Sequence, residues 1–276
     1  MIRAVEDILK FMILTLSTPL KPGSVHRLSP DPEFEHRLVE VLSIAGFMEE
    51  AYRRGSDLAQ GRITASSLGL GHLIGQGYRR VFEEADVKPL PGVTASCITL
   101  SAIMGYSVES GLDPLQSLSR LILNTIYRSG PDDAISMIEG MEAVGLADEL
   151  LHLEYKGLTK RAIKLEARSL GDVFEVLAER DAGFLLNIKN YNDILRLARR
   201  AQASKSIIHA ILRTYLDLAS IVDPRFRGMD ESRINAKTLA RLDKEVRATG
   251  RLDSLLGGVL VSVYLGYGLR RERRIT

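Results

Sequence analysis

A stiff, cation-rich segment near the start of the chain is the first whose residues suggest chemistry. It reads Lys21-Pro22-Gly23-Ser24-Val25-His26-Arg27 and holds three side chains that can carry positive charge. Proline fixes the backbone, and glycine permits turns that a side chain would block. Because a rigid loop with free amides and cations suits phosphate recognition, we predict phosphate contacts from Lys21, Gly23, His26 and Arg27. The alternative is a solvated connection between two helices.

Carboxylates at the starts of expected helices form the second group. Glu35 and His36 lie in the first turn of one helix, with Glu35 at the edge of its apolar stripe. An acid there costs desolvation energy unless a cation, a metal ion or a proton meets it. Asp133 and Asp253 also stand at expected helix starts. Carboxylates that converge can hold Mg²⁺ beside substrate phosphates, whereas helix capping is the alternative for each of them.

Helices must position these residues, because apolar side chains recur at intervals of three and four through most of the chain. Val5, Ile8, Leu9 and Met12 are one example. This is the periodicity of amphipathic helices, and alternation with a period of two is almost absent. Proline and glycine at expected helix ends divide the pattern into about ten helices. We therefore predict an all-α fold, a single-domain multi-helix bundle that spans residues 1–276.

Composition excludes several classes of protein. Of the 276 residues, 45% are hydrophobic and 26% are charged, the balance of a globular chain. With 37 basic and 35 acidic residues, the charge gives no support for nucleic-acid binding. The single cysteine, Cys97, excludes a disulfide framework, fits a cytoplasmic protein, and has apolar neighbours that predict burial. No signal peptide is evident, and the most apolar segment, residues 254–269, is too short to span a bilayer, so no membrane association is predicted.

Taken in order, these segments resemble the family of triphosphoribosyl-dephospho-CoA synthases. The residues from Lys21 to Arg27, followed by Phe34-Glu35-His36, look like the Lys-Pro-Gly-x-Val loop and next helix of the branch common in archaea. Later matches are weaker, and they are Asp133-Ala134, Arg180-Asp181, Leu242-Asp243 and Asp253-Ser254-Leu255. The family's Gly-Asn-Thr-(His/Asn)-x-Gly segment is best matched by residues 92–97, which keep Gly92 and Thr94 but lack the asparagine and the second glycine.

The resemblance implies an all-helical transferase that moves the triphosphoribosyl group of ATP to 3′-dephospho-CoA and releases adenine. It implies catalytic roles for Glu35, His36, Asp133 and Asp253, with Mg²⁺ held by Glu35, Asp133 and Asp253. Phosphate or nucleotide contacts would come from Lys21, Gly23, His26, Arg27, Thr94 and Arg180. The partners would then be ATP and dephospho-CoA.

Two other functions are compatible with the sequence. A divergent paralogue would keep the helical scaffold and bind a nucleotide or another phosphorylated ligand without the transfer, as the altered segment at residues 92–97 suggests. A helical oligomerisation protein with no ligand site is the third reading, and an acid beside an apolar stripe at Glu35 argues against it. The sequence leaves open whether the protein is a homo-oligomer.

Overall fold

The computed structural model describes residues 1–19, 21–29, 32–115, 117–118, 125–187, 192–229 and 235–269. These residues are mostly helical and contain no strand, so the predicted all-α class is confirmed. The α-helices are α1 (Arg3–Ser17), α2 (Glu33–Ser43), α3 (Ala45–Ala59), α4 (Leu70–Ala85), α5 (Pro91–Ser110), α7 (Pro131–Ala143), α8 (Ala147–Tyr155), α9 (Lys160–Leu165), α10 (Leu170–Leu177), α11 (Asn192–Gln202), α12 (Ile207–Val222), α13 (Ala236–Arg247) and α14 (Leu256–Val263). Shorter helical turns are η1 (Ala65–Ser67), η2 (Ile126–Arg128), η3 (Ala182–Asn187), η4 (Pro224–Phe226), η6 (Asp253–Leu255) and η7 (Tyr264–Gly268).

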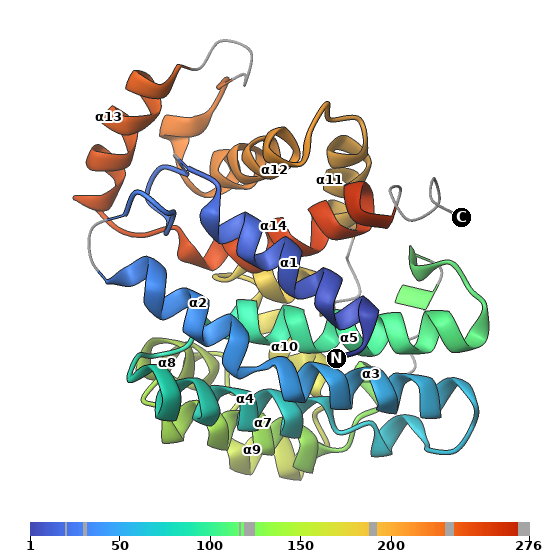
Figure 1. Cartoon of the computed structure of the whole chain (residues 1–276). Coiled ribbons are helices and arrows are strands. Elements are labelled where there is room, and N and C mark those ends of the chain that lie inside the picture. Colours follow the sequence, from blue (N-terminus) through green and yellow to red (C-terminus); the bar gives the residue numbers. More distant parts are fainter. Residues whose placement is uncertain are drawn as a thin grey trace.

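The long helix α5 runs through the middle of the molecule (Figure 1). Sixteen of its 20 residues are buried, including Cys97, as predicted. Burial raises the pKa of the Cys97 thiol, which keeps it protonated and unreactive. Among the helices of the described residues, α5 is the one long and apolar enough to cross a membrane, yet 89% of its most apolar window is buried inside the protein. Its apolar character is therefore explained by its place in the core.

Glycines let neighbouring helices approach until their backbones touch. A Cβ atom on Gly55 of α3 would lie 2.0 Å from the Ala102 carbonyl oxygen of α5, and one on Gly105 of α5 would lie 1.9 Å from the Tyr52 carbonyl oxygen of α3. The pair α4 and α7 uses the same device, because a Cβ on Gly71 would lie 2.2 Å from the Asp133 carbonyl oxygen. These contacts fix the lower layers of the fold, where α3, α4 and α7 lie below α5 (Figure 1).

The C-terminal part of the chain forms an upper layer. The wholly buried α14 packs on α5 and against α11 and α12. In contrast, α13 lies at the corner of the molecule (Figure 1), with three buried residues among its twelve. One of them, Val246, contacts Gly23 in the segment that connects α1 to α2. This connecting segment, residues 21–29, is called the Gly23 loop below.

Candidate functional site

Lys21 lies inside the protein, at the C-terminal end of α1. Its side chain is 0% exposed, and Nζ donates hydrogen bonds to the carbonyl oxygens of Thr18 at 2.7 Å and Leu16 at 3.2 Å. The end of a helix leaves such carbonyls without helical partners. Burial lowers the pKa of Lys21 to about 7, although the Asp253 carboxylate acts in the opposite direction. The Lys21 amine thus caps the C-terminal end of α1. It does not face solvent, where an external phosphate could reach it.

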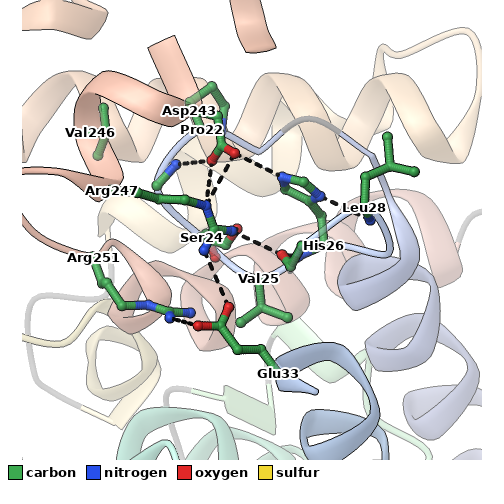
Figure 2. A network of polar contacts seen from close by, with 12 residues as sticks. Pro22, Ser24, Val25, His26, Leu28, Glu33, Asp243, Val246, Arg247 and Arg251 are labelled. Carbon is green, nitrogen blue, oxygen red and sulfur yellow. Dashed lines mark hydrogen bonds and ion pairs between the residues drawn. The ribbon is translucent and has the colours of Figure 1, made fainter. Parts of the chain in front are cut away.

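The Gly23 loop does gather hydrogen-bond donors on anions, but the anions belong to the chain itself (Figure 2). The Gly23 amide donates to Asp243 Oδ1 of α13 at 2.7 Å. The Val25 amide at 2.7 Å and the Ser24 hydroxyl at 3.0 Å both donate to Asp253 Oδ1. Gly23 has a φ of +79°, a conformation that favours glycine. The Gly23 loop thus has the hydrogen-bond donors that the sequence predicts for an anion site. In this structure the carboxylates of Asp243 and Asp253 accept those hydrogen bonds.

Two arginines extend this network to α2. Arg247 Nε contacts Asp243 at 2.9 Å, and its guanidinium also binds the Ser24 carbonyl oxygen at 2.6 Å and Glu33 at 3.2 Å. Arg251 pairs with Glu33 and, at 2.7 Å, with Asp253. Burial acts against ionisation of Glu33, but the hydrogen bond from Arg251 holds the pKa of Glu33 below its ordinary value. The network therefore ties α2, the Gly23 loop and α13 together through charged groups.

His26 is the least satisfied member of this network. It is 2% exposed, and its Nδ1 accepts a hydrogen bond from the Leu28 amide at 3.1 Å. The hydrogen of the neutral ring therefore sits on Nε2. Asp243 Oδ2 lies 3.5 Å from Nε2, a long ion-pair contact (Figure 2), and in the described part of the chain Nε2 has no hydrogen-bond partner of good geometry. Arg27, the next residue, is exposed.

The acids predicted to share a magnesium ion are fixed at three separate places. Glu35 is exposed on α2, where Glu33 makes the contacts to the loop network instead, and His36 beside it is half-buried. Asp133 accepts hydrogen bonds from the first amides of α4, with the His72 amide at 2.9 Å, and burial raises its pKa. Asp253 is held by the Gly23 loop.

No group of three or more His, Cys, Asp or Glu side chains in the described residues is placed to hold a metal ion. Glu35, Asp133 and Asp253 therefore do not fit one magnesium ion. The physical reason is that Asp133 and Asp253 each already accept hydrogen bonds from backbone amides of their own neighbourhood. A requirement for Mg²⁺ stays a prediction from the resemblance.

A cavity of about 130 Å³ adjoins the Gly23 network, because Ser254 lines it and follows Asp253 directly. Its walls are Leu90, Pro91, Asp148, Glu149, His152, Leu177, Arg180, Asp181 and Ser254. They come from the N-terminal end of α5, from α8, and from the end of α10 with the residues after it. We call this space the Asp181 cavity.

Asp181 is a half-buried acid in the wall of this cavity. Its carboxylate accepts hydrogen bonds from the amides of Gly92 at 2.9 Å and Gly183 at 2.8 Å. Burial raises the pKa of Asp181 to about 7, although these two hydrogen bonds act against the rise. A Cβ on Gly92 would lie 2.0 Å from Asp181 Oδ1, so only glycine allows the carboxylate to reach the start of α5. This close approach gives Gly92 a structural role.

Three other wall residues have charged groups without partners. The side chains of Asp148, Glu149 and Arg180 form no hydrogen bond or ion pair in the part of the chain that the structure describes. Arg180 is exposed, which places its guanidinium at the mouth of the cavity. Thr94, in contrast, does not line the cavity; it is buried in α5, with Oγ1 3.5 Å from the buried carboxylate of Glu40.

The structure therefore brings together some predicted site residues and separates others. Gly23, His26 and Asp253 form one network, and Arg180 lies beside Ser254 in the adjoining cavity. Sequence reasoning assigned no site role to Glu33, Asp243, Arg247 or Arg251, although Asp243 lies in one of the weaker matches and its spacing of four residues from Arg247 is a visible ion-pair signal. Comparisons with protein-family models, with curated proteins and with solved structures found no match.

Proposed function

We propose that the chain binds a phosphorylated small molecule of the nucleotide type at the Asp181 cavity. The observation that carries this proposal is the meeting of distant segments at one place. The Gly23 loop holds Asp253, Ser254 lines the cavity, and Asp181 binds the amide of Gly92. These are the segments at residues 21–27, 92–97, 180–181 and 253–255 that resemble the triphosphoribosyl-dephospho-CoA synthases.

The charged side chains of the cavity wall that form no ion pair suit the phosphate and the sugar of such a ligand. The guanidinium of Arg180 offers paired donors to phosphate oxygens at the mouth. Asp148 and Glu149 present carboxylate oxygens, which accept hydrogen bonds from sugar hydroxyls. The ligand is therefore expected to contact Arg180 through its phosphate, and Asp148 and Glu149 through its sugar.

The size of the cavity favours binding over the transfer that the resemblance implies. Pockets for small molecules usually enclose about 300–1,000 Å³. A volume of about 130 Å³ encloses one sugar-sized unit and not ATP together with dephospho-CoA. The predicted magnesium ligands also lie apart. Both observations support the divergent paralogue as the first candidate.

Triphosphoribosyl transfer is the second candidate, and Asp181 is the observation in its favour. A carboxyl group with a pKa of about 7 can take a proton from a hydroxyl nucleophile near neutral pH. Incubation with ATP, Mg²⁺ and dephospho-CoA, followed by chromatography for free adenine, separates the two candidates. We expect ATP to raise the melting temperature without release of adenine. Release of adenine would establish the transferase instead.

Arg180→Ala is expected to weaken ATP binding about tenfold or more, measured by isothermal titration calorimetry. The reason is the loss of a charge-assisted hydrogen bond, which contributes about 1.5–3 kcal/mol. Arg161→Ala is the matched control, because Arg161 is equally an exposed arginine but lies on α9 outside the cavity. Equal ATP affinities of the two variants would remove Arg180 from the site and with it the proposed function.

A further inference from the structure

His152 of α8 is a buried histidine in the wall of the Asp181 cavity, and the proposed function leaves it without a role. Its side chain is 8% exposed. Asp148 and Glu149 line the same cavity and precede His152 by four and three residues. Residues at these spacings lie on one face of a helix. The three side chains therefore form one polar wall, which any ligand in the cavity meets.

The two ring nitrogens of His152 lie in different surroundings. Nε2 is buried and lies 3.3 Å from Glu179 Oε2, an ion-pair contact without good hydrogen-bond geometry. A carboxylate beside Nε2 favours the neutral tautomer whose hydrogen is on that nitrogen, which gives Nδ1 a free lone pair. Nδ1 accepts no hydrogen bond from the described residues. Unlike Nε2 it is not fully buried, so it can be reached from the cavity that the ring lines.

Glu179 is itself held in place beside this ring. Lys156 Nζ lies 2.7 Å from Oε2 and 2.8 Å from Oε1 of the Glu179 carboxylate. Glu179 directly precedes Arg180, whose guanidinium is expected to contact the phosphate of the ligand. A sugar attached to that phosphate would occupy the cavity that His152 lines. The imidazole is therefore placed to meet the sugar and not the phosphate.

Hydrogen-bond acceptors predominate on the cavity wall. The carboxylates of Asp148 and Glu149 form no hydrogen bond or ion pair in the described part of the chain, and Nδ1 of His152 is a third free acceptor. The Asp181 carboxylate already accepts hydrogen bonds from two backbone amides. A ligand group that fits this wall must therefore supply donors. The ribose of a nucleotide supplies two neighbouring hydroxyl groups, each with one donor hydrogen, whereas a deoxyribose supplies only one.

We propose that Nδ1 of His152 accepts a hydrogen bond from a ribose hydroxyl of the bound nucleotide, so that the cavity selects ribonucleotides over deoxyribonucleotides. The inference rests on the proposed function, because it concerns the sugar of the same ligand. Asp148 is exposed and Glu149 is half-buried, so water replaces a missing hydroxyl beside them. His152 is buried, and a buried polar group that is left unpaired costs more than an exposed one. A site of this kind rejects analogues that lack the hydroxyl.

Isothermal titration calorimetry on the unaltered protein tests this selection without any variant. The ligands are ATP, 2′-deoxy-ATP and 3′-deoxy-ATP at about pH 8, where an ordinary imidazole is neutral. We expect one of the two deoxy analogues to bind about tenfold or more weakly than ATP, because the lost hydroxyl leaves Nδ1 unpaired. Equal affinities for the three nucleotides would overturn this inference alone. Failure of all three to bind would overturn the proposed function as well.

His152→Gln tests the residue itself. The glutamine amide lies near the position of Nε2, next to Glu179, and no atom replaces Nδ1. We expect the ATP affinity of this variant to fall about tenfold, to that of the weaker deoxy analogue, and the difference between the nucleotides to vanish. His72→Gln is the matched control, because His72 is an exposed histidine of α4 outside the cavity. A folded His152→Gln variant that still discriminates as the control does would overturn the proposal.

Discussion

Gly55→Ala is expected to lower the free energy of unfolding by about 3 kcal/mol or more, measured by urea unfolding followed with circular dichroism. The added Cβ would lie 2.0 Å from the carbonyl oxygen and 2.9 Å from the carbonyl carbon of Ala102. Both are backbone atoms of α5, so a rotamer change cannot relieve the clash. The two helices would have to separate along their contact, where Gly105 makes the reciprocal approach to Tyr52. Packing would be lost on both sides of that contact.

Gly46→Ala supplies the matched control within the same helix. A Cβ on Gly46 has no atom within 4 Å, and its backbone is helical. Alanine there restricts the unfolded chain and raises helix propensity, which is worth about 0.5–1 kcal/mol in favour of the fold. The two substitutions should thus differ in sign. Similar unfolding free energies for both variants would contradict the close backbone contact of α3 with α5.

The helical class could be predicted from the sequence because it depends on local information. Apolar residues such as Val5, Ile8 and Met12 repeat with the helical period, and these three are buried on one face of α1. The central helix α5 has no such face, since it is buried on almost every side. Its apolar composition shows that it is buried, but not which residues meet which neighbours. The glycines allow particular helices to pack in backbone contact with α5, and which helices these are can be seen only in the folded structure.

The donors of the Gly23 loop could also be predicted, whereas their anions could not. Pro22 and Gly23 in sequence favour a rigid turn with free amides, and the turn is present. The carboxylate that the Gly23 amide binds is 220 residues away in the chain. A sequence pattern carries no signal for a contact of that separation. The sequence therefore predicts a loop that is open to an external phosphate, although Asp243 and Asp253 fill it.

The sequence predicts a site role for Glu35 of α2, whereas Glu33 of the same helix joins the observed network. The difference is one of helix register. Glu33 and Glu35 are two residues apart, which places them on opposite sides of a helix. Glu33 meets Arg247 and Arg251, whereas Glu35 is exposed. The choice between them depends on how α2 is rotated against the loop, and both lie in a first turn where acids are favourable. The apolar stripe favours Glu35 in the sequence, whereas the observed rotation of α2 brings Glu33 to the arginines.

Lys21→Met is expected to destabilise the protein by about 2 kcal/mol above neutral pH without lowering its affinity for ATP. The substitution keeps an unbranched apolar side chain of similar length but leaves the carbonyl oxygens of Leu16 and Thr18 buried without their donor. A buried polar group that loses its partner costs about 1–3 kcal/mol. The measurement is urea unfolding, with ATP titration on the folded variant.

The cost of Lys21→Met should also grow with pH. The pKa of Lys21 is lowered from 10.5 to about 7 in the folded protein, so between these values the unfolded chain binds the extra proton. Stability rises with pH wherever the unfolded state binds more protons, which means that Lys21 contributes rising stability from about pH 7 to 10.5 and no slope below pH 7. The methionine variant lacks this slope, so its deficit relative to the unaltered protein should widen across that window.

Lys10→Met separates this effect from the general loss of a lysine. Lys10 lies on α1, the helix that Lys21 caps, with a side chain that is 63% exposed, and it pairs with the neighbouring acids Glu6 and Asp7. Its removal should change stability by a few tenths of a kcal/mol and leave the slope above pH 7 intact. A stable Lys21→Met variant that had lost its ATP affinity would contradict the capping role. It would return Lys21 to the phosphate contact that the sequence predicts, and the Gly23 loop would then have to open far enough to release the end of α1.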